Sequence, residues 1–304
     1  MTRRELAGTL LAAVPLEARR IDRRRISAIT DEIGATPEDS IAFARRYKLE
    51  WVELRSVPGT KREYAFTAEA ELKATAVALA RDGLKVSFLN TSLLKFPWPG
   101  TEPARQREET PEARARRLEA EAARFSRRMD NLRKAIAAAH ILGVDKVRVF
   151  AGTRVAEPER MYPRIAEVLG EMGFVAGKEK VHLLIENEPS CNVGSSAELA
   201  AILKLLPSKW VGINWDAMNC TALKETPFPD GYSLLPKDRI GNVQMKGHSL
   251  LNPERRLDWK AIFAALDRDG YRGQVGLETH YREAERIEAS HASMREIMRL
   301  IGEA

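Results

Sequence analysis

Residues 211–216 read VGINWD, a short apolar run that ends on a carboxylate, and runs of this kind recur along the chain. Residues 182–188, HLLIENE, begin 29 residues earlier, and residues 240–247, IGNVQMKG, begin 29 residues later. Each run is rich in Ile, Leu and Val, which favours a strand, and a stretch with helical periodicity separates it from the next. The sequence therefore predicts alternating strands and helices.

The same pattern extends in both directions from these three runs. Their starts are 25 to 36 residues apart, except for 61 residues between the third and the fourth. Eight strand and helix units in succession predict a (β/α)8 TIM barrel, a single domain over residues 26–304. The eight predicted strands are Ile26–Thr30, Trp51–Arg55, Lys85–Asn90, Lys146–Gly152, His182–Glu188, Val211–Asp216, Ile240–Gly247 and Gln274–His280.

Helix signals lie between the predicted strands. Thr36, followed by Pro37, and Ser195 are N-cap residues, and Gly83, Gly143 and Gly270 stand where helices would end. The alternation is therefore supported by capping chemistry as well as by periodicity.

The long third interval predicts a loop at the carboxyl rim of the barrel and then one helix from about residue 112 to residue 142. Phe96 and Trp98 lie in that loop. Loops at this rim often cover a ligand, whereas loop aromatic residues often pack down onto the protein. Both interpretations of the two aromatic residues stay open.

Charge and composition exclude several classes of protein. The chain has 304 residues and a net charge of +6, but residues 1–25 account for +4 of it, so residues 26–304 are nearly neutral and nucleic-acid binding is not expected. No apolar run reaches the roughly 18 residues of a membrane span. Cys191 and Cys220 are too few for a disulfide framework and are expected to be free thiols.

The basic segment of residues 1–25 has two interpretations. Arg3 and Arg4 followed by the mildly apolar residues 6–16 resemble a twin-arginine export signal, although the expected small-residue cleavage site is incomplete. The alternative is a basic extension on a cytoplasmic enzyme. The sequence does not separate the two.

Polar side chains recur at the ends of the last four predicted strands. Glu186, Asp216, Gln244 and Glu278 are 30, 28 and 34 residues apart, about one strand and helix unit each. Because the carboxyl ends of barrel strands share one rim, the four side chains should converge there. Their oxygen atoms would suit one divalent ion, Mn²⁺ or Mg²⁺, or Co²⁺ or Zn²⁺ if His248 joins.

Simpler structural roles exist for the same residues. Glu186 and Glu278 could pair with Arg148 or Lys246, and Asp216 could cap the helix that follows it. Four polar residues at four successive strand ends make a shared site the preferred hypothesis.

Six short motifs, taken in order, resemble the xylose isomerase-like barrel superfamily of sugar phosphate isomerases and epimerases over residues 26–302. They are residues 29–32 (ITDE), 52–55 (VELR), 184–188 (LIENE), 212–216 (GINWD), 243–246 (VQMK) and 276–280 (GLETH). The resemblance implies metal ligands at Glu186, Asp216, Gln244 and Glu278. This chain departs from the family in having Gln244 in place of the usual metal-binding His, and Asn219 in place of a substrate-contacting His.

The resemblance implies a metal-dependent isomerase or epimerase of a small sugar or sugar phosphate that acts through an enediolate. Glu186 and Glu278 would stand on opposite sides of the substrate as base and acid. A lyase or dehydratase acting on an inosose or a keto-sugar, and a barrel that only binds sugar, are the alternatives. A homo-oligomer is left open. The expected substrate contacts are Glu53, Arg55, Asn90, Arg148, Asn219, Lys246, His248 and His280.

Overall fold

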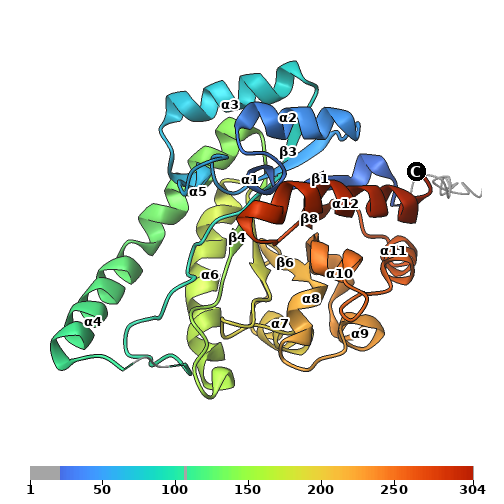
Figure 1. Cartoon of the computed structure of the whole chain (residues 1–304). Helices are drawn as coiled ribbons and strands as arrows, with labels where there is room; N and C mark the ends of the chain where they lie inside the picture. The colour runs from blue at the N-terminus through green and yellow to red at the C-terminus, as the bar shows by residue number, and fades with distance from the viewer. Residues whose placement is uncertain (1–20, 106–107, 304) are drawn as a thin grey trace, which may run out of the picture.

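The computed structural model describes residues 21–105 and 108–303. Eight parallel strands form a nearly closed barrel, which confirms the predicted architecture, and Figure 1 shows the helices arranged around it. The strands are β1 (Ile26–Ala28), β2 (Trp51–Leu54), β3 (Lys85–Leu89), β4 (Lys146–Val149), β5 (His182–Glu186), β6 (Val211–Asp216), β7 (Ile240–Lys246) and β8 (Val275–Glu278).

From β2 to β8, each strand pairs with the next strand in the sequence, and β1 pairs with β8. A single parallel bridge between Ile29 and Glu53 links the first two strands. The register sets Asp216 beside Gln244 and Lys246 beside Glu278. The polar side chains in each of these pairs therefore lie at the same level along the barrel axis.

The α-helices occupy the predicted intervals between strands. They are α1 (Thr30–Ile33), α2 (Pro37–Arg46), α3 (Glu69–Arg81), α4 (Pro111–Ser126), α5 (Arg128–Leu142), α6 (Tyr162–Lys178), α7 (Ser196–Lys204), α8 (Ala217–Thr221), α9 (Tyr232–Leu234), α10 (Gly247–Leu251), α11 (Trp259–Arg268) and α12 (Glu283–Ile301). Short 3-10 turns at Arg23–Arg25, Tyr64–Phe66, Pro158–Met161 and Lys237–Arg239 complete the connections.

The caps predicted from the sequence are present. The Thr36 side chain accepts a hydrogen bond from the Asp39 amide, and the Asp39 carboxylate accepts one from the Thr36 amide, which closes a capping box on α2. Ser195 caps α7 by accepting a hydrogen bond from the Glu198 amide. Gly143 ends α5 with a φ of 69°, in the left-handed region that favours glycine.

The long third interval differs from the prediction of one helix over residues 112–142. The chain forms two helices, α4 and α5, which meet at Arg127, and α4 extends away from the barrel (Figure 1). Phe96 and Trp98 are 6% and 1% exposed, so the loop aromatic residues pack into the protein and do not form an open lid.

The described part of the N-terminal segment lies against the amino end of the barrel. Ile21 is buried in the core, and the Arg25 guanidinium donates to the backbone oxygens of Tyr271 and Gly273. The two arginines of the export-signal interpretation, and the rest of residues 1–20, lie outside the described residues. Between residues 21 and 303, no described helix has the length and apolar character needed to cross a membrane.

Candidate functional site

Three carboxylates meet at the carboxyl end of the barrel. Glu186 ends β5, Asp216 ends β6 and Glu278 ends β8, and one oxygen from each lies within 4.8 Å of the others. All three side chains are buried. Their convergence follows from the strand spacing that the sequence predicted.

Each of these carboxylates has a buried or half-buried cation beside it. The Lys246 ammonium lies 2.5 Å from Asp216 and 3.2 Å from Glu278. Arg148 pairs with Glu186 at 2.8 Å, and Arg55 pairs with Glu278 at 3.1 Å. The structural role considered for Arg148 and Lys246 is therefore present, and it places three cations directly around the carboxylates.

Burial and these ion pairs shift the proton affinities of the cluster in different directions. Burial raises the pKa of Asp216 to about 6, even though Lys246 opposes that shift. Burial would also raise the pKa of Glu278, but Lys246, a hydrogen bond from His280 and the two arginines hold it well below its usual range. Burial would lower the pKa of Lys246, and the carboxylates outweigh it and raise that pKa. Glu278 is thus ionised and Lys246 charged at neutral pH.

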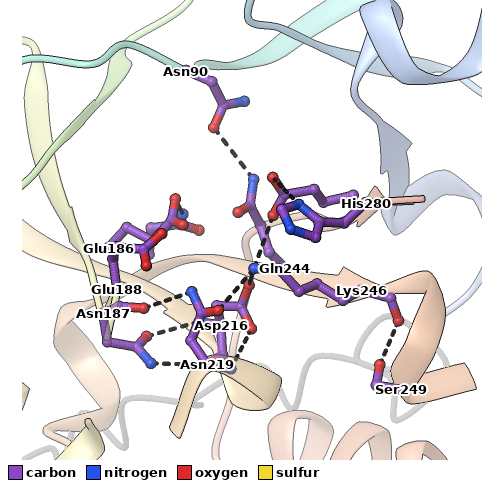
Figure 2. Close-up of polar contacts among 12 residues, drawn as sticks. Asn90, Glu186, Asn187, Glu188, Asp216, Asn219, Gln244, Lys246, Ser249 and His280 are labelled. Atoms are coloured by element: carbon purple, nitrogen blue, oxygen red, sulfur yellow. Dashed lines mark hydrogen bonds and ion pairs between the residues drawn. The ribbon is translucent and has the colours of Figure 1, made fainter. Parts of the chain in front are cut away.

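Gln244 is the fourth predicted metal ligand. Its amide nitrogen faces away from Glu186 and Asp216 (Figure 2). It donates to Glu53 at 3.0 Å and to Asn90 at 3.3 Å. The Gln244 carbonyl oxygen is buried, and no side chain or backbone group of the described residues donates a hydrogen bond to it. Figure 2 shows the nitrogen directed toward Asn90 and the oxygen on the side where Glu186 is drawn.

The residues present fit a divalent ion. The oxygens of Glu186, Asp216 and Glu278 are close enough to share one ion, and they are the donor type that Mg²⁺ and Mn²⁺ prefer. The carbonyl oxygen of Gln244 is the same type of atom, and it is buried without a hydrogen bond from any described residue. Gln244 leaves the strand beside Asp216, as a shared set of ligands requires.

Glu53 and Asn90, expected to contact substrate, lie deeper in the barrel. Both are 0% exposed. Glu53 accepts hydrogen bonds from Asn90, Gln244, Asn242 and Ser27, and burial raises its pKa against the effect of these four bonds. In this structure the two residues belong to a buried, hydrogen-bonded polar layer below Glu186, Asp216 and Glu278.

Two asparagines of this buried layer were not singled out from the sequence as site residues. Asn214 donates to Glu186 at 3.0 Å, and Asn242 donates to Asn214 at 3.0 Å. Each lies two residues before a predicted ligand, Asp216 or Gln244, so strand alternation placed them on the same inner face. That alternation is the signal that identifies them.

Asn219 and Asn187 form hydrogen bonds at the start of α8. The Asn219 amide donates to the Asn187 backbone oxygen at 2.8 Å and accepts from Lys246 at 2.9 Å. Asp216 also caps α8 by accepting from the Asn219 backbone amide (Figure 2), so the capping role considered for it is present beside the ion pair. The polar atoms of the Asn219 side chain thus contact protein groups.

The two rim histidines occupy different positions. His280 has a φ of 54°, its ring lies 3.8 Å from Glu278, and its backbone amide donates to Glu32. His248 lies in α10, beyond the end of β7, and stacks on Tyr281 at 4.1 Å between ring centroids.

A second acidic group, missed as a site from the sequence, holds Arg55 in place. The Arg55 guanidinium lies 2.8 Å from Asp31 and 2.9 Å from Glu32. Asp31 and Glu32 belong to the ITDE motif of residues 29–32, which the sequence offered only as part of a resemblance. Together they orient Arg55 toward Glu278.

Comparison with family models gives a match over residues 41–301 to the xylose isomerase-like TIM barrel. The chain belongs to this family. No curated protein sequence matches it. The match spans all but the first strand of the barrel and includes Glu186, Asp216 and Glu278.

Solved structures share the fold at low sequence identity. The IolI protein with a bound zinc atom is 15% identical with a TM-score of 0.64, covering 91% of this chain and 98% of that one. The 3-keto-D-glucoside 4-epimerase YcjR of E. coli is 14% identical with a TM-score of 0.65 and the same coverage. The probable 3-DHS dehydratase AsbF of Bacillus anthracis is 13% identical with a TM-score of 0.64, covering 90% and 98%. At such identities the likeness establishes the barrel fold alone.

Proposed function

We propose that this xylose isomerase-like barrel is an isomerase or epimerase of a small sugar or sugar phosphate, and that it moves a proton through an enediolate. One observation carries the proposal. Glu186 and Glu278 project from β5 and β8 into the same barrel end, with Asp216 between them in the strand order and all three within 4.8 Å. Two carboxylates so placed can remove a proton from a carbon next to a carbonyl and return one.

Glu186, Asp216, Glu278 and the carbonyl oxygen of Gln244 would hold a divalent ion. When bound, such an ion supplies a Lewis acid that polarises a substrate carbonyl and its neighbouring hydroxyl. The fit of the oxygen donors supports this part of the proposal, and the zinc named for the IolI structure agrees with it.

The chain's own charged groups define the acid and base roles. Glu278 is held ionised by its three neighbouring cations, so it is the proposed base. Glu186 is held by hydrogen bonds from Arg148 and Asn214 and is the proposed acid: it delivers a second proton, taken from solvent, while Glu278 releases the abstracted proton to solvent. Lys246 has N–H groups at the same barrel end, where they can stabilise negative charge on a substrate oxygen.

Dehydration of a keto-sugar is the second candidate function, and the position of Lys246 favours it. Its ammonium lies beside both Asp216 and Glu278, where it could protonate a departing hydroxyl. The same two carboxylates raise its pKa, which makes that proton costly to release. Isomerisation or epimerisation is preferred for this reason.

A substrate screen tests the proposal. The full-length protein is incubated with Mn²⁺ and a panel of ketoses, ketose phosphates and inososes, and each mixture is analysed by NMR. A new stereoisomer or the paired aldose supports the proposal, and loss of water with a new enone supports the dehydratase. Binding of a sugar with no product from any member of the panel would indicate a barrel that only binds sugar.

A further inference from the structure

The geometry points to Glu53 as a positioning residue that fixes which end of the Gln244 amide faces the metal-binding carboxylates. This inference rests on the metal site of the proposed function and adds a determinant of that site on the opposite side of the barrel, 191 positions away in the sequence.

As a carboxylate, the Glu53 side chain can only accept hydrogen bonds, and the four donors around it favour this form against the burial that raises its pKa. Its Oε1 accepts from Ser27 and Asn242, and its Oε2 accepts from Asn90 and Gln244. Four donors therefore converge on one fully buried carboxylate. The Gln244 amide can therefore form a hydrogen bond with this carboxylate only through its NH₂ group.

Asn90 also links Glu53 to the orientation of the Gln244 amide. Because its amide nitrogen donates to Glu53, its oxygen faces Gln244 and accepts from Gln244 Nε2 at 3.3 Å. Both acceptors of the Gln244 NH₂ group thus depend on Glu53. The Gln244 oxygen must then occupy the other side of the amide, where it is buried and unpartnered by any described residue.

Gly276 leaves space in the barrel wall for the Glu53 carboxylate. A Cβ atom added to Gly276 of β8 would lie 1.9 Å from Glu53 Oε1, so only glycine is compatible with this carboxylate position. A direct substrate contact does not explain Glu53, because the side chain is 0% exposed and both oxygens already accept two bonds. Fixing the orientation of Gln244 explains the carboxylate, its depth and its partners.

The test is the affinity for Mn²⁺ of the full-length protein, measured by isothermal titration calorimetry without substrate. Glu53→Gln brings an NH₂ group among four donors, so the amide network must rearrange. The expected loss of Mn²⁺ affinity is about 10- to 100-fold. Ser27→Ala is the matched control, since it removes one bond from Oε1 and leaves Oε2 on Gln244. Its affinity should stay within about threefold of the wild type.

A charge exchange keeps the test decisive if Glu53→Gln folds poorly. In Glu53→Gln/Gln244→Glu, the new glutamate accepts from the new amide and still presents an oxygen to the ion, so affinity should return. Thermal unfolding of each variant reports on folding. A folded Glu53→Gln that binds Mn²⁺ as the wild type does, or a Ser27→Ala that loses as much, would overturn the inference alone. A wild type that binds no Mn²⁺ would overturn it together with the metal part of the proposed function.

Discussion

The ammonium nitrogen of Lys246 lies 2.5 Å from a carboxylate oxygen of Asp216, and both side chains are buried at the carboxyl end of the barrel. The same ammonium lies 3.2 Å from Glu278. One protein cation is therefore already placed against two of the carboxylates that would hold a divalent ion. Lys246 therefore offsets part of the negative charge of Asp216 and Glu278.

Lys246→Met should therefore lower the free energy of unfolding in EDTA by about 3 kcal/mol, since it leaves the buried Asp216 carboxylate without its cation and leaves Glu278 with Arg55 as its closest remaining cation. Saturating Mn²⁺ should restore more stability to this variant than it adds to the wild type. Thermal unfolding with and without Mn²⁺ measures both effects. Lys73→Met, at an exposed pair with Glu69, is the control and should change stability by less than about 0.5 kcal/mol. Equal stability of Lys246→Met and wild type in EDTA would refute the charge-balancing role.

Glu278→Gln and Asn219→Ala should have different kinetic effects. Glu278→Gln should abolish turnover, because an amide neither accepts nor returns the proton. Asn219→Ala removes one acceptor of Lys246 and the bond to the Asn187 backbone while the carboxylates remain. We expect it to raise KM several-fold with little change in kcat. A comparable loss of kcat in both variants would mean that the start of α8 takes part in the chemistry.

Gly276→Ala should destabilise the protein by about 2 kcal/mol, because its Cβ atom would overlap Glu53 and come within 3.1 Å of Ser27. Gly170→Ala is the matched control. Gly170 lies within α6 with no atom within 4 Å of an added Cβ, so the change should stabilise by up to about 1 kcal/mol. Urea unfolding of the two variants gives the comparison, and equal effects would show that the space at Gly276 is not required.

The fold was predictable because each strand carries its own local signal. Val211–Asp216 was predicted with its observed bounds, while Ile26–Thr30 ends early because Thr30 begins α1. The division of residues 112–142 at Arg127 had no comparable signal, since the residues around it favour helix.

The site was predictable only as far as strand register determines it. The convergence of Glu186, Asp216 and Glu278 follows from one repeat per strand and side-chain alternation. The orientation of Gln244 depends on Glu53, which lies across the barrel, and on the hydrogen bonds of Asn90. No spacing rule in the sequence contains that information, because it arises from packing inside the closed barrel.

Two buried thiols should make the protein less stable in alkali. Burial raises the pKa of Cys191 and of Cys220 from about 9 to about 12. Above pH 9 the unfolded chain loses thiol protons that the folded chain keeps, so stability falls as the pH rises toward 12. The urea midpoint should be lower at pH 10.5 than at pH 8.5, with a shallower decline in the Cys191→Ala/Cys220→Ala variant. A midpoint that rises over this range would contradict the assignment.

The most direct test of the account is deuterium incorporation during turnover in heavy water. The enzyme is incubated with a ketose that it converts, and NMR reads the label at each carbon. Proton abstraction by Glu278 and delivery of a solvent-derived deuteron by Glu186 predict deuterium at the carbon next to the carbonyl, and none with Glu278→Gln. Full conversion by the wild type with no deuterium at that carbon would contradict carboxylate-mediated proton transfer.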